Sequence, residues 1–321
     1  MAEGVAAAAG VAAVAEPGAG PATRLGTGIG WRPEIAGIVA ELPGLRFCEV
    51  IAEAIDPAAP PRGVAELRDR GVPVIPHGVR LSLGSADGLD PERVAHLAAC
   101  ADALDAPLVS EHVSFTRVAG RDAGHLLPVP RTREALDVLV ANVARVQAEL
   151  DVPLALEPVA ALFDWPGDEF TEAEFLTRLL DRTEAWLLLD VANVHANAVN
   201  RGGDPCAVLD GLPLDRIAYV HVAGGSEHPG DTAAGDPGVY HDSHTDPVPP
   251  EVFALLGELC DRRLPPAVML ERDGRYPPAA ELAAELAAIS AAARFAPPAA
   301  RAAAAGQVVP AAAGVAPGVL R

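Results

Sequence analysis

The sequence contains no lysine, so all 24 of its strongly basic side chains are arginines. Aromatic residues make up only 4% of the chain, whereas hydrophobic residues make up 50% of it, so a large core must be mainly aliphatic. The formal net charge is -20, and such an acidic surface repels phosphate groups. We therefore expect no nucleic-acid partner, whereas cation binding is compatible with this charge.

The four cysteines form no C-x-x-C pair, which disfavours a zinc-knuckle or thioredoxin-like motif. Scattered thiols of this kind are typical of a protein kept reduced in the cytoplasm. No basic segment precedes the apolar residues near Met1, and no run of about twenty strongly apolar residues occurs. The sequence predicts neither a signal peptide nor a membrane span, and we expect a cytoplasmic protein.

Both ends of the chain are rich in alanine, glycine and proline and poor in bulky side chains. Segments of this composition bury too little apolar surface to offset the entropy lost on ordering. We expect residues 1–24 and 294–321 to be disordered tails and residues 25–293 to form one catalytic domain.

Within residues 25–293, short apolar segments alternate with amphipathic ones. Eight segments predict buried strands because their apolar character is continuous: Gly26–Gly30, Leu45–Glu53, Val72–Val79, Pro107–Phe115, Pro153–Val159, Ala185–Val194, Arg216–Ala223 and Pro266–Arg272. Helix signals lie between them, such as the Asp90-Pro91 start and the capping box that begins at Thr171. The pattern predicts an α/β protein with a (β/α)8 TIM barrel. An open doubly wound sheet is disfavoured because no G-x-G-x-x-G follows an early strand.

Seven of these strands end close to a carboxylate or an imidazole. The endings are Glu53, His77, His112, Glu157, Asp190, His221 and Glu271. Buried strands do not usually finish on ionisable side chains unless these groups are paired or hold a metal. Because the carboxyl ends of the strands surround the working face of a TIM barrel, we expect these side chains to converge.

The converging set contains more acids than can stay ionised together without cations. Its candidates are Glu49, Glu53, His77, Glu111, His112, Glu157, Asp190, Asn193, His221, Asp242, His244 and Glu271. Histidine mixed with Asp and Glu suits Fe, Mn or Zn better than Ca or Mg, and there are ligands for two or three ions. Two alternatives stay open. Glu49 and Glu53 can equally be outward charges at a strand end, and the segment 224–250 can be a solvated loop or a lid that carries Asp242 and His244 over the site.

The motifs at these positions resemble a known family. The segments GIGWRP, HGVRLSLGSAD, LVSEHVSF, LLPVP, LALEP, LLLDVANV, YVHVAG, HDSHTDPV and MLERD follow one another across residues 25–277. Together they are similar to the multinuclear non-haem iron-dependent oxidative enzymes, which include the methanobactin biosynthesis oxidase. The resemblance implies a TIM barrel of the xylose-isomerase-like type, two or three iron ions of mixed valence, and O2 as co-substrate. It also implies RiPP biosynthesis, in which the enzyme oxidises a ribosomally synthesised precursor peptide, with cysteine as the expected target, and a separate partner protein that recognises the leader peptide.

Carried over residue by residue, the resemblance implies a set of metal ligands. These are His77, His112, Glu157, Asp190, Asn193, His221 and Glu271 for the main ions, and Asp242 with His244 for a third ion and for catalysis. Glu111 is expected to take part in catalysis or to orient a ligand. The sequence departs from the family at Ala192, where an asparagine is usual, and at Gly225, where a histidine is usual. These departures leave the occupancy of the third site open.

Two other classes of protein remain possible from the sequence. A divalent-metal sugar isomerase or an AP-endonuclease-like TIM barrel also places Glu, Asp and His at the ends of late strands. The acidic net charge counts against the endonuclease, and isomerase turnover with Mn or Co in the absence of O2 would favour the isomerase. A metal-binding scaffold without activity is a third interpretation, which is disfavoured because an unused cluster of buried acids costs stability.

Overall fold

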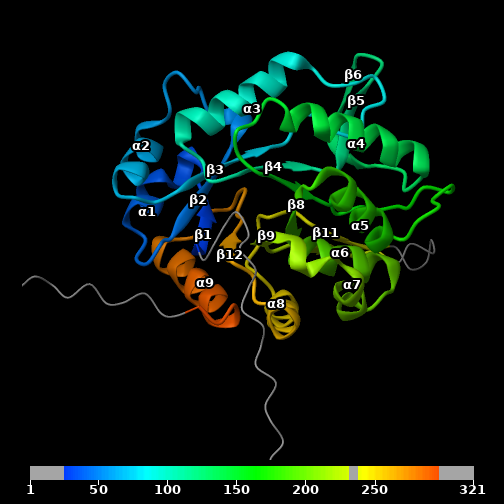
Figure 1. The fold of residues 1–321 in the computed structure, drawn as a ribbon. Helices are drawn as coiled ribbons and strands as arrows, with labels where there is room; N and C mark the ends of the chain where they lie inside the picture. The colour runs from blue at the N-terminus through cyan, green and yellow to red at the C-terminus, as the bar shows by residue number, and fades with distance from the viewer. Residues whose placement is uncertain (1–24, 231–237, 296–321) are drawn as a thin grey trace, which may run out of the picture.

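The computed structural model describes residues 25–230 and 238–295, and a closed barrel of eight parallel strands forms its centre (Figure 1). The strands are β1 (Gly26–Gly30), β2 (Phe47–Ile51), β3 (Val74–Gly78), β4 (Val109–His112), β7 (Leu154–Glu157), β8 (Trp186–Asp190), β9 (Ile217–Val222) and β12 (Ala267–Leu270). Around the barrel they follow the order β1-β12-β9-β8-β7-β4-β3-β2. Because β1 pairs in parallel with both β12 and β2, the sheet closes, and the predicted TIM barrel is confirmed.

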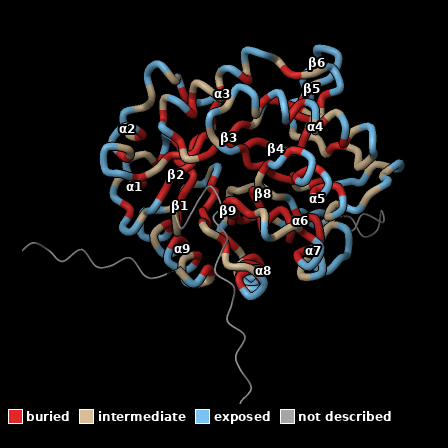
Figure 2. The backbone as a smooth tube through the Cα atoms, in the orientation of Figure 1, coloured by how far each residue is buried: buried red, intermediate tan, exposed pale blue. Residues whose placement is uncertain are grey.

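Helices surround the barrel, and the strands between them are buried (Figure 2). The helices are α1 (Ala36–Glu41), α2 (Arg62–Asp69), α3 (Pro91–Leu104), α4 (Arg133–Gln147), α5 (Glu172–Thr183), α6 (Val191–Arg201), α7 (Pro205–Gly211), α8 (Pro250–Arg262) and α9 (Ala279–Ala292). Two predicted helix starts are confirmed. The Asp90 side chain accepts the Glu92 N–H at 3.1 Å, and Thr171 and Glu174 form a capping box at the start of α5.

An apolar layer fills the interior of the barrel. It includes Phe47, Ile75, Leu108, Ala155, Leu188, Tyr219, Ala267 and Met269. Gly28 leaves room for this layer, since a Cβ at that position would lie 2.5 Å from the Phe47 ring. Successive side chains of a strand point to opposite faces, so residues two places further along these strands also face the interior. The polar residues at the strand ends therefore lie directly on an apolar floor.

The strand predicted over residues 185–194 is wrong at its carboxyl end. β8 stops at Asp190, and α6 begins at Val191. The Asp190 side chain accepts the backbone N–H groups of Ala192 and Asn193 at 2.6 and 3.2 Å. An aspartate in this position provides partners for N–H groups that the first helical turn leaves free. Asn193 therefore lies in the first turn of a helix and not on a strand.

Two small antiparallel sheets lie outside the barrel. β5 (Ser114–Val118) pairs with β6 (Arg121–Pro128), and β10 (Ser226–His228) pairs with β11 (Val239–His241). The first sheet corrects the prediction of one strand running through Phe115. The second shows that part of the segment 224–250, which was expected to be a solvated loop or a lid, forms an antiparallel sheet. Asn200 of α6 holds β11, because its Oδ1 accepts the Tyr240 N–H at 2.7 Å and its Nδ2 donates to the Tyr240 carbonyl at 2.9 Å.

The remaining predictions concern the ends of the chain, the membrane and the cysteines. The predicted tail 1–24 and most of the predicted tail 294–321 lie outside the described residues. None of the described helices is long and apolar enough to cross a membrane. All four cysteines are free thiols; three are buried, and Cys206 is half-buried.

Candidate metal centre

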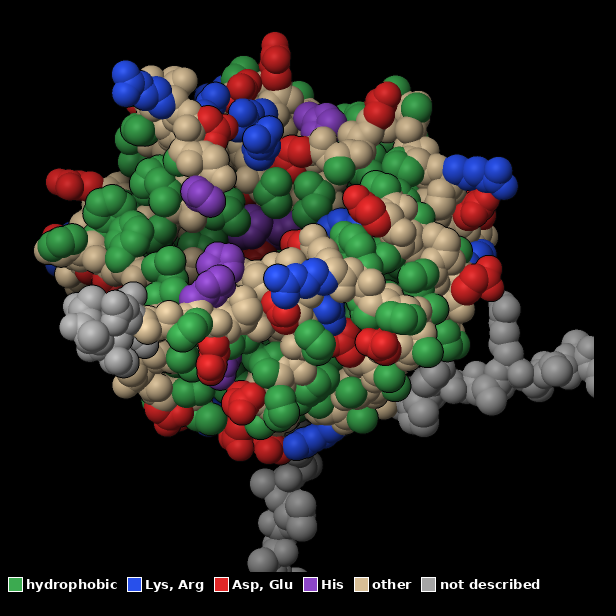
Figure 3. All heavy atoms as spheres, turned by 180° about the vertical axis from the view of Figure 1, so that it is seen from behind, with side chains coloured by type: hydrophobic (Ala, Val, Ile, Leu, Met, Phe, Trp, Pro, Cys, Tyr) green, Lys and Arg blue, Asp and Glu red, His purple; other side chains and the backbone are tan. Residues whose placement is uncertain are grey.

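Histidines and carboxylates from distant parts of the chain meet at the carboxyl ends of the barrel strands. Seen from behind, the molecule has a central hollow with histidine side chains at its floor (Figure 3). Within the described residues, five groups offer ligand atoms that lie within 4.8 Å of one another: His77, His112 and Glu157; Glu49, His221 and Glu271; Glu157, Asp190 and His221; Asp190, Asp242 and His244; His244, Glu271 and Asp273. Several residues belong to two groups, so the groups form one continuous cluster.

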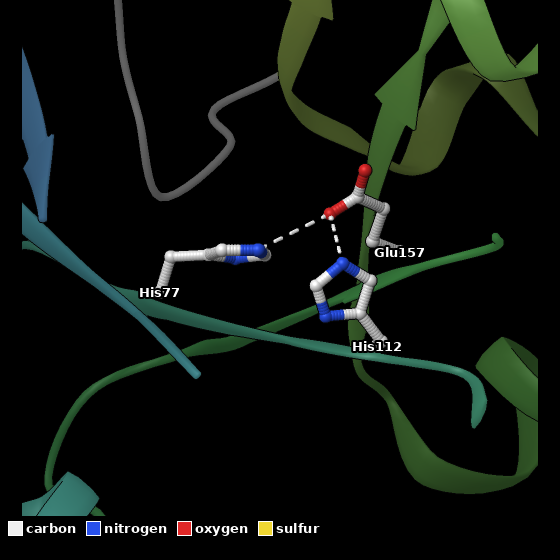
Figure 4. Close-up of side chains that lie close together, drawn as sticks. All are labelled: His77, His112 and Glu157. Carbon is white, nitrogen blue, oxygen red and sulfur yellow. Dashed lines mark ion pairs between the residues drawn. The ribbon is translucent and has the colours of Figure 1, made fainter. Parts of the chain in front are cut away.

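The first group joins the ends of β3, β4 and β7. Glu157 Oε2 lies 3.5 Å from His77 Nε2 and 3.3 Å from His112 Nε2 (Figure 4). The other ring nitrogens have their own partners, since His112 Nδ1 is 3.2 Å from the Gly78 carbonyl and His77 Nδ1 is 2.8 Å from Ser110 Oγ. A carbonyl oxygen can only accept, so His112 Nδ1 carries the proton and Nε2 of the neutral ring presents a lone pair to the carboxylate. Two ring nitrogens thus face one carboxylate oxygen, as ligands around a metal ion do.

His221 lies between three carboxylates at the end of β9. Its Nε2 is 2.8 Å from Glu49 Oε2, while its Nδ1 is 3.0 Å from Glu271 Oε2 and 3.6 Å from Glu157 Oε1. Despite the 3.0 Å distance, His221 Nδ1 has no partner in hydrogen-bond geometry. If the proton of the neutral ring is on Nε2, facing Glu49, the Nδ1 lone pair faces two carboxylates, and this is unfavourable unless a cation lies between them.

The structure decides between the two alternatives for Glu49 and Glu53. Glu49 is fully buried and accepts the Tyr219 hydroxyl at 2.6 Å. Glu53 is exposed and accepts the Val79 N–H at 3.1 Å. The interpretation as an outward charge therefore fits Glu53 and is wrong for Glu49, which lies two residues after the interior Phe47 on the same strand.

A further group joins the end of β8 to the segment after β11. His244 Nε2 lies 2.9 Å from Asp242 Oδ2 and 3.8 Å from Asp190 Oδ2. Its Nδ1 lies 3.4 Å from Glu271 Oε2 and 3.6 Å from Asp273 Oδ2. The backbone of His244 has a φ of 53°, a left-handed conformation that costs energy in a non-glycine residue and is found preferentially at functional sites. Asp273 was not among the candidates predicted from the sequence. Its place two residues after Glu271 is nevertheless the spacing that puts two side chains on one face of an extended chain.

Arg32, from the segment after β1, binds two of these acids. Its Nη2 lies 3.3 Å from Glu271 Oε1, and its Nε donates to Asp273 Oδ1 at 2.9 Å. The guanidinium group engages one oxygen of Glu271 and leaves Oε2 facing His221 and His244. The GIGWRP motif thus supplies a positioning residue for the cluster that the sequence had not singled out.

Glu111 lies beside the cluster, and none of the five groups found among the described residues includes it. Its Oε2 accepts the Leu81 N–H at 3.1 Å, and its Oε1 accepts the His112 N–H at 2.9 Å. One of these contacts is made to the backbone of His112, and the orientation of a ligand by Glu111 stays a prediction. A direct part for Glu111 in catalysis stays a prediction.

Burial and mutual charge shift the pKa values of the cluster. Burial alone would lower the pKa of His112, but the charges of Glu157 and Glu111 outweigh it and raise this pKa to about 9. Burial would raise the pKa of Glu157, but His112 and His221 lower it to about 2. Burial and then the charge of Asp242 raise the pKa of Asp190 to about 7. Without cations, protons must therefore balance these charges, and a metal ion would replace those protons.

Polar atoms without a hydrogen-bond partner are concentrated in this cluster. Among the described residues, eleven buried side-chain nitrogen and oxygen atoms have no such partner, and six of them lie here: Glu49 Oε1, Glu157 Oε2, Asp190 Oδ2, Asn193 Oδ1, His221 Nδ1 and Asp242 Oδ1. Leaving a buried polar group unpaired costs roughly 1–3 kcal/mol. So many unpaired atoms in one place therefore indicate a bound group that is not part of the protein. Imidazole nitrogens and carboxylate oxygens form a donor set that suits iron, manganese and zinc. The residues present therefore fit a centre of more than one metal ion.

Comparisons with known proteins identify the family of this chain. A sequence profile of the family described as "RiPP precursor modification enzyme MbnB/TglH/ChrH" matches residues 26–294. Curated relatives named UPF0276 protein include one from Streptomyces avermitilis, 54% identical over 272 residues that cover 83% of this chain and 54% of the relative. Another, from Rhizorhabdus wittichii, is 43% identical over 75% of this chain and 84% of the relative, and one from Caulobacter vibrioides is 38% identical over 81% and 91%. The chain therefore spans about half the length of the Streptomyces relative and most of the other two.

Solved structures share the fold at low sequence identity. They include D-allulose 3-epimerase from Methylomonas sp. (TM-score 0.52, 17% identity, 83% of this chain and 96% of that one) and 3-keto-D-glucoside 4-epimerase from E. coli (0.53, 13%, 83% and 98%). Endonuclease IV from Thermus thermophilus is a third (0.50, 21%, 84% and 98%). These likenesses show the fold alone, which is that of the xylose-isomerase-like TIM barrels. Because the family profile extends from β1 to the end of α9, the chain belongs to the RiPP precursor modification enzyme family MbnB/TglH/ChrH.

Proposed function

We propose that this protein uses two or three iron ions of mixed valence, together with O2, to oxidise a ribosomally synthesised precursor peptide at a cysteine. The observation that carries the proposal is the group of His77, His112 and Glu157, in which two buried ring nitrogens face one shared carboxylate oxygen. Further ligand groups adjoin it through Glu157. Family membership supports the substrate class, and the donor set supports the metal.

The ligand groups suggest how the ions would be held. His77, His112 and Glu157 would hold one ion, and Glu157, Asp190, Asn193, His221 and Glu271 would hold a second. Asp242 and His244, with Asp190, would hold the third. Bound iron would supply a Lewis acid for the substrate thiolate and one-electron exchange with O2.

The protein itself would orient the ligands and close the floor of the site. Gly78 and Arg32 engage the far sides of His112 and Glu271, so each ligand keeps one orientation. The apolar layer below excludes water from that side, so the peptide would approach from the hollow.

Asp242 and His244 are proposed to act on the substrate as well as on an ion. They are half-buried, whereas the other proposed ligands are buried, so they lie nearest to an approaching peptide. Burial would lower the pKa of His244, but Asp242 and then Glu271 raise it well above the usual range. In a molecule whose third ion is absent, the proton of His244 would lie between Asp242 and His244 and would be exchanged with the substrate.

The test is anaerobic purification followed by metal analysis and turnover. We expect at least two iron ions per chain, and O2 uptake that accompanies a mass change in a cysteine-containing precursor peptide encoded beside the gene. Protein without stoichiometric iron after anaerobic purification would contradict the proposal. Sugar turnover with Mn or Co in the absence of O2 would instead support the isomerase alternative.

We also propose that a separate partner protein recognises the leader peptide. The family resemblance in sequence motivates this, because members of that family often work with such a partner. Co-expression with the neighbouring gene products and affinity purification should recover a stoichiometric complex. Full turnover of the precursor peptide by the purified chain alone would show that no partner is required.

A further inference from the structure

A chain of short hydrogen bonds runs beneath the cluster and links four strands. His77 Nδ1 is 2.8 Å from Ser110 Oγ, which is 2.7 Å from the Tyr219 hydroxyl. That hydroxyl is 2.6 Å from Glu49 Oε2, which is 2.8 Å from His221 Nε2. All five residues are buried, with at most 1% of each exposed. The chain therefore connects histidines of two different ligand groups without contact with solvent.

The number of available protons determines which atom donates in each of these hydrogen bonds. The Tyr219 hydroxyl donates its single proton to Glu49 Oε2. Ser110 must then donate its own proton to Tyr219, and it has none left for His77. His77 Nδ1 must therefore donate to Ser110, which leaves Nε2 as a lone pair facing Glu157. At the other end, Glu49 accepts from His221 Nε2, which leaves His221 Nδ1 as a lone pair facing the cluster.

We propose that Tyr219 and Ser110 are positioning residues that set the protonated nitrogen of His77, anchor Glu49 against His221, and so couple two metal-binding groups. The proposal rests on the proposed function, because it assigns these residues a role in metal binding. His77 and His221 are the two ends of this hydrogen-bond chain and present the lone pairs. Tyr219 lies in its middle and contacts neither His77 Nε2 nor His221 Nδ1.

Packing alone does not account for the Tyr219 hydroxyl. The Tyr219 ring stands edge-on to Phe47, with centroids 6.2 Å apart, in a layer whose other members are apolar. Phenylalanine would make the same ring contact without burying a polar group, which is costly unless it is hydrogen-bonded. The hydroxyl is thus explained by its two polar neighbours and not by the apolar layer.

The test compares Tyr219→Phe, Ser110→Ala and the double variant with the wild type by anaerobic titration with Co(II), whose absorption spectrum reports its ligands. His77→Ala identifies the spectral component of the ion at His77. Ser114→Ala is the matched control, because the Ser114 hydroxyl is also buried but has no hydrogen-bond partner among the described residues. Melting temperatures of the metal-free proteins establish that each variant is folded.

We expect Tyr219→Phe to weaken binding at the His77 component by about 10–100-fold and to change its spectrum, although Tyr219 does not touch His77. Ser110→Ala should do the same, and the double variant should be no worse than either single one, since each break interrupts the same chain. Ser114→Ala should bind as the wild type does. A Tyr219→Phe variant with an unchanged His77 component, or singles whose effects add fully, would overturn the proposal.

A second measurement needs no metal. Ring 15N shifts of His77 in the metal-free protein, at a pH where the ring is neutral, should show the proton on Nδ1 in the wild type and a mixture of tautomers in Ser110→Ala. A mixture in the wild type would overturn the inference even if the protein binds metal. If the wild type binds no metal but holds the proton on Nδ1, the proposed function and the coupling of two metal-binding groups would be refuted. The assignment of donors and acceptors in the hydrogen-bond chain would still hold.

Discussion

Replacing Glu157 by glutamine removes one negative charge at the point where two ligand groups meet. Glu157 Oε2 faces His77 and His112 at 3.5 and 3.3 Å, and Oε1 faces His221 Nδ1 at 3.6 Å. The glutamine keeps the size of the side chain and one neutral oxygen. The substitution therefore tests the charge of Glu157 with little change in packing.

The expected loss follows from Coulomb's law. Two unit charges about 4 Å apart interact by about 4 kcal/mol at an effective dielectric constant of about 20. A divalent ion should lose at least this interaction energy. Because about 1.4 kcal/mol corresponds to a tenfold change in affinity, metal binding should weaken by at least about a thousandfold. Because Glu157 belongs to two groups of possible ligands, more than one ion should be affected.

The assay is metal analysis of anaerobically purified protein, followed by competition with a chelator of known affinity. The wild type should hold at least two ions per chain, and Glu157→Gln should lose at least one. Glu53→Gln is the matched control, since Glu53 is also a glutamate close to a strand end but is exposed. Retention of every ion by Glu157→Gln with affinity within about threefold of the wild type would refute the role of Glu157 as a shared ligand.

Three further predictions concern the third group, pH and the barrel interior. His244→Ala should lose one ion and retain those at His77 and His221, as measured by metal analysis; loss of every ion would refute a separate third site. In the metal-free protein the pKa of His112 is raised from 6.5 to about 9, so its contribution to stability is present below pH 6.5 and is lost as pH rises to about 9. The melting temperature should fall over that range, and less so when metal is bound, because an ion replaces the proton; an equal fall in both forms would contradict this. Phe47→Ala should lower the free energy of unfolding in urea by about 3–5 kcal/mol because it empties the interior layer, whereas Phe163→Ala at a side chain 44% exposed should change it by about 0.5 kcal/mol or less.

The residues that the sequence predicted well share a local signal. Continuous apolar runs ending in His77, Glu157 or His221 indicate both a buried strand and the polar group at its end. The Asp190 case shows the limit of this signal, since the same apolar run continues into α6 and hides the residue at which the strand gives way to the helix. The two hydrogen bonds that the Asp190 side chain accepts from the backbone N–H groups of Ala192 and Asn193 locate that point.

By itself, the sequence determined the alternation of strands and helices, the polar strand ends and therefore the barrel with histidines and carboxylates at one face. These properties are local, because side-chain period and apolar content can be counted along a few residues. Only the tertiary structure separated the buried Glu49 from the exposed Glu53, and only it brought Arg32 to Glu271 and Tyr219 to Glu49. The two residues of each contacting pair lie far apart in the sequence. Their contact depends on how the barrel closes and how far each strand extends toward the rim, and no local sequence pattern contains this information.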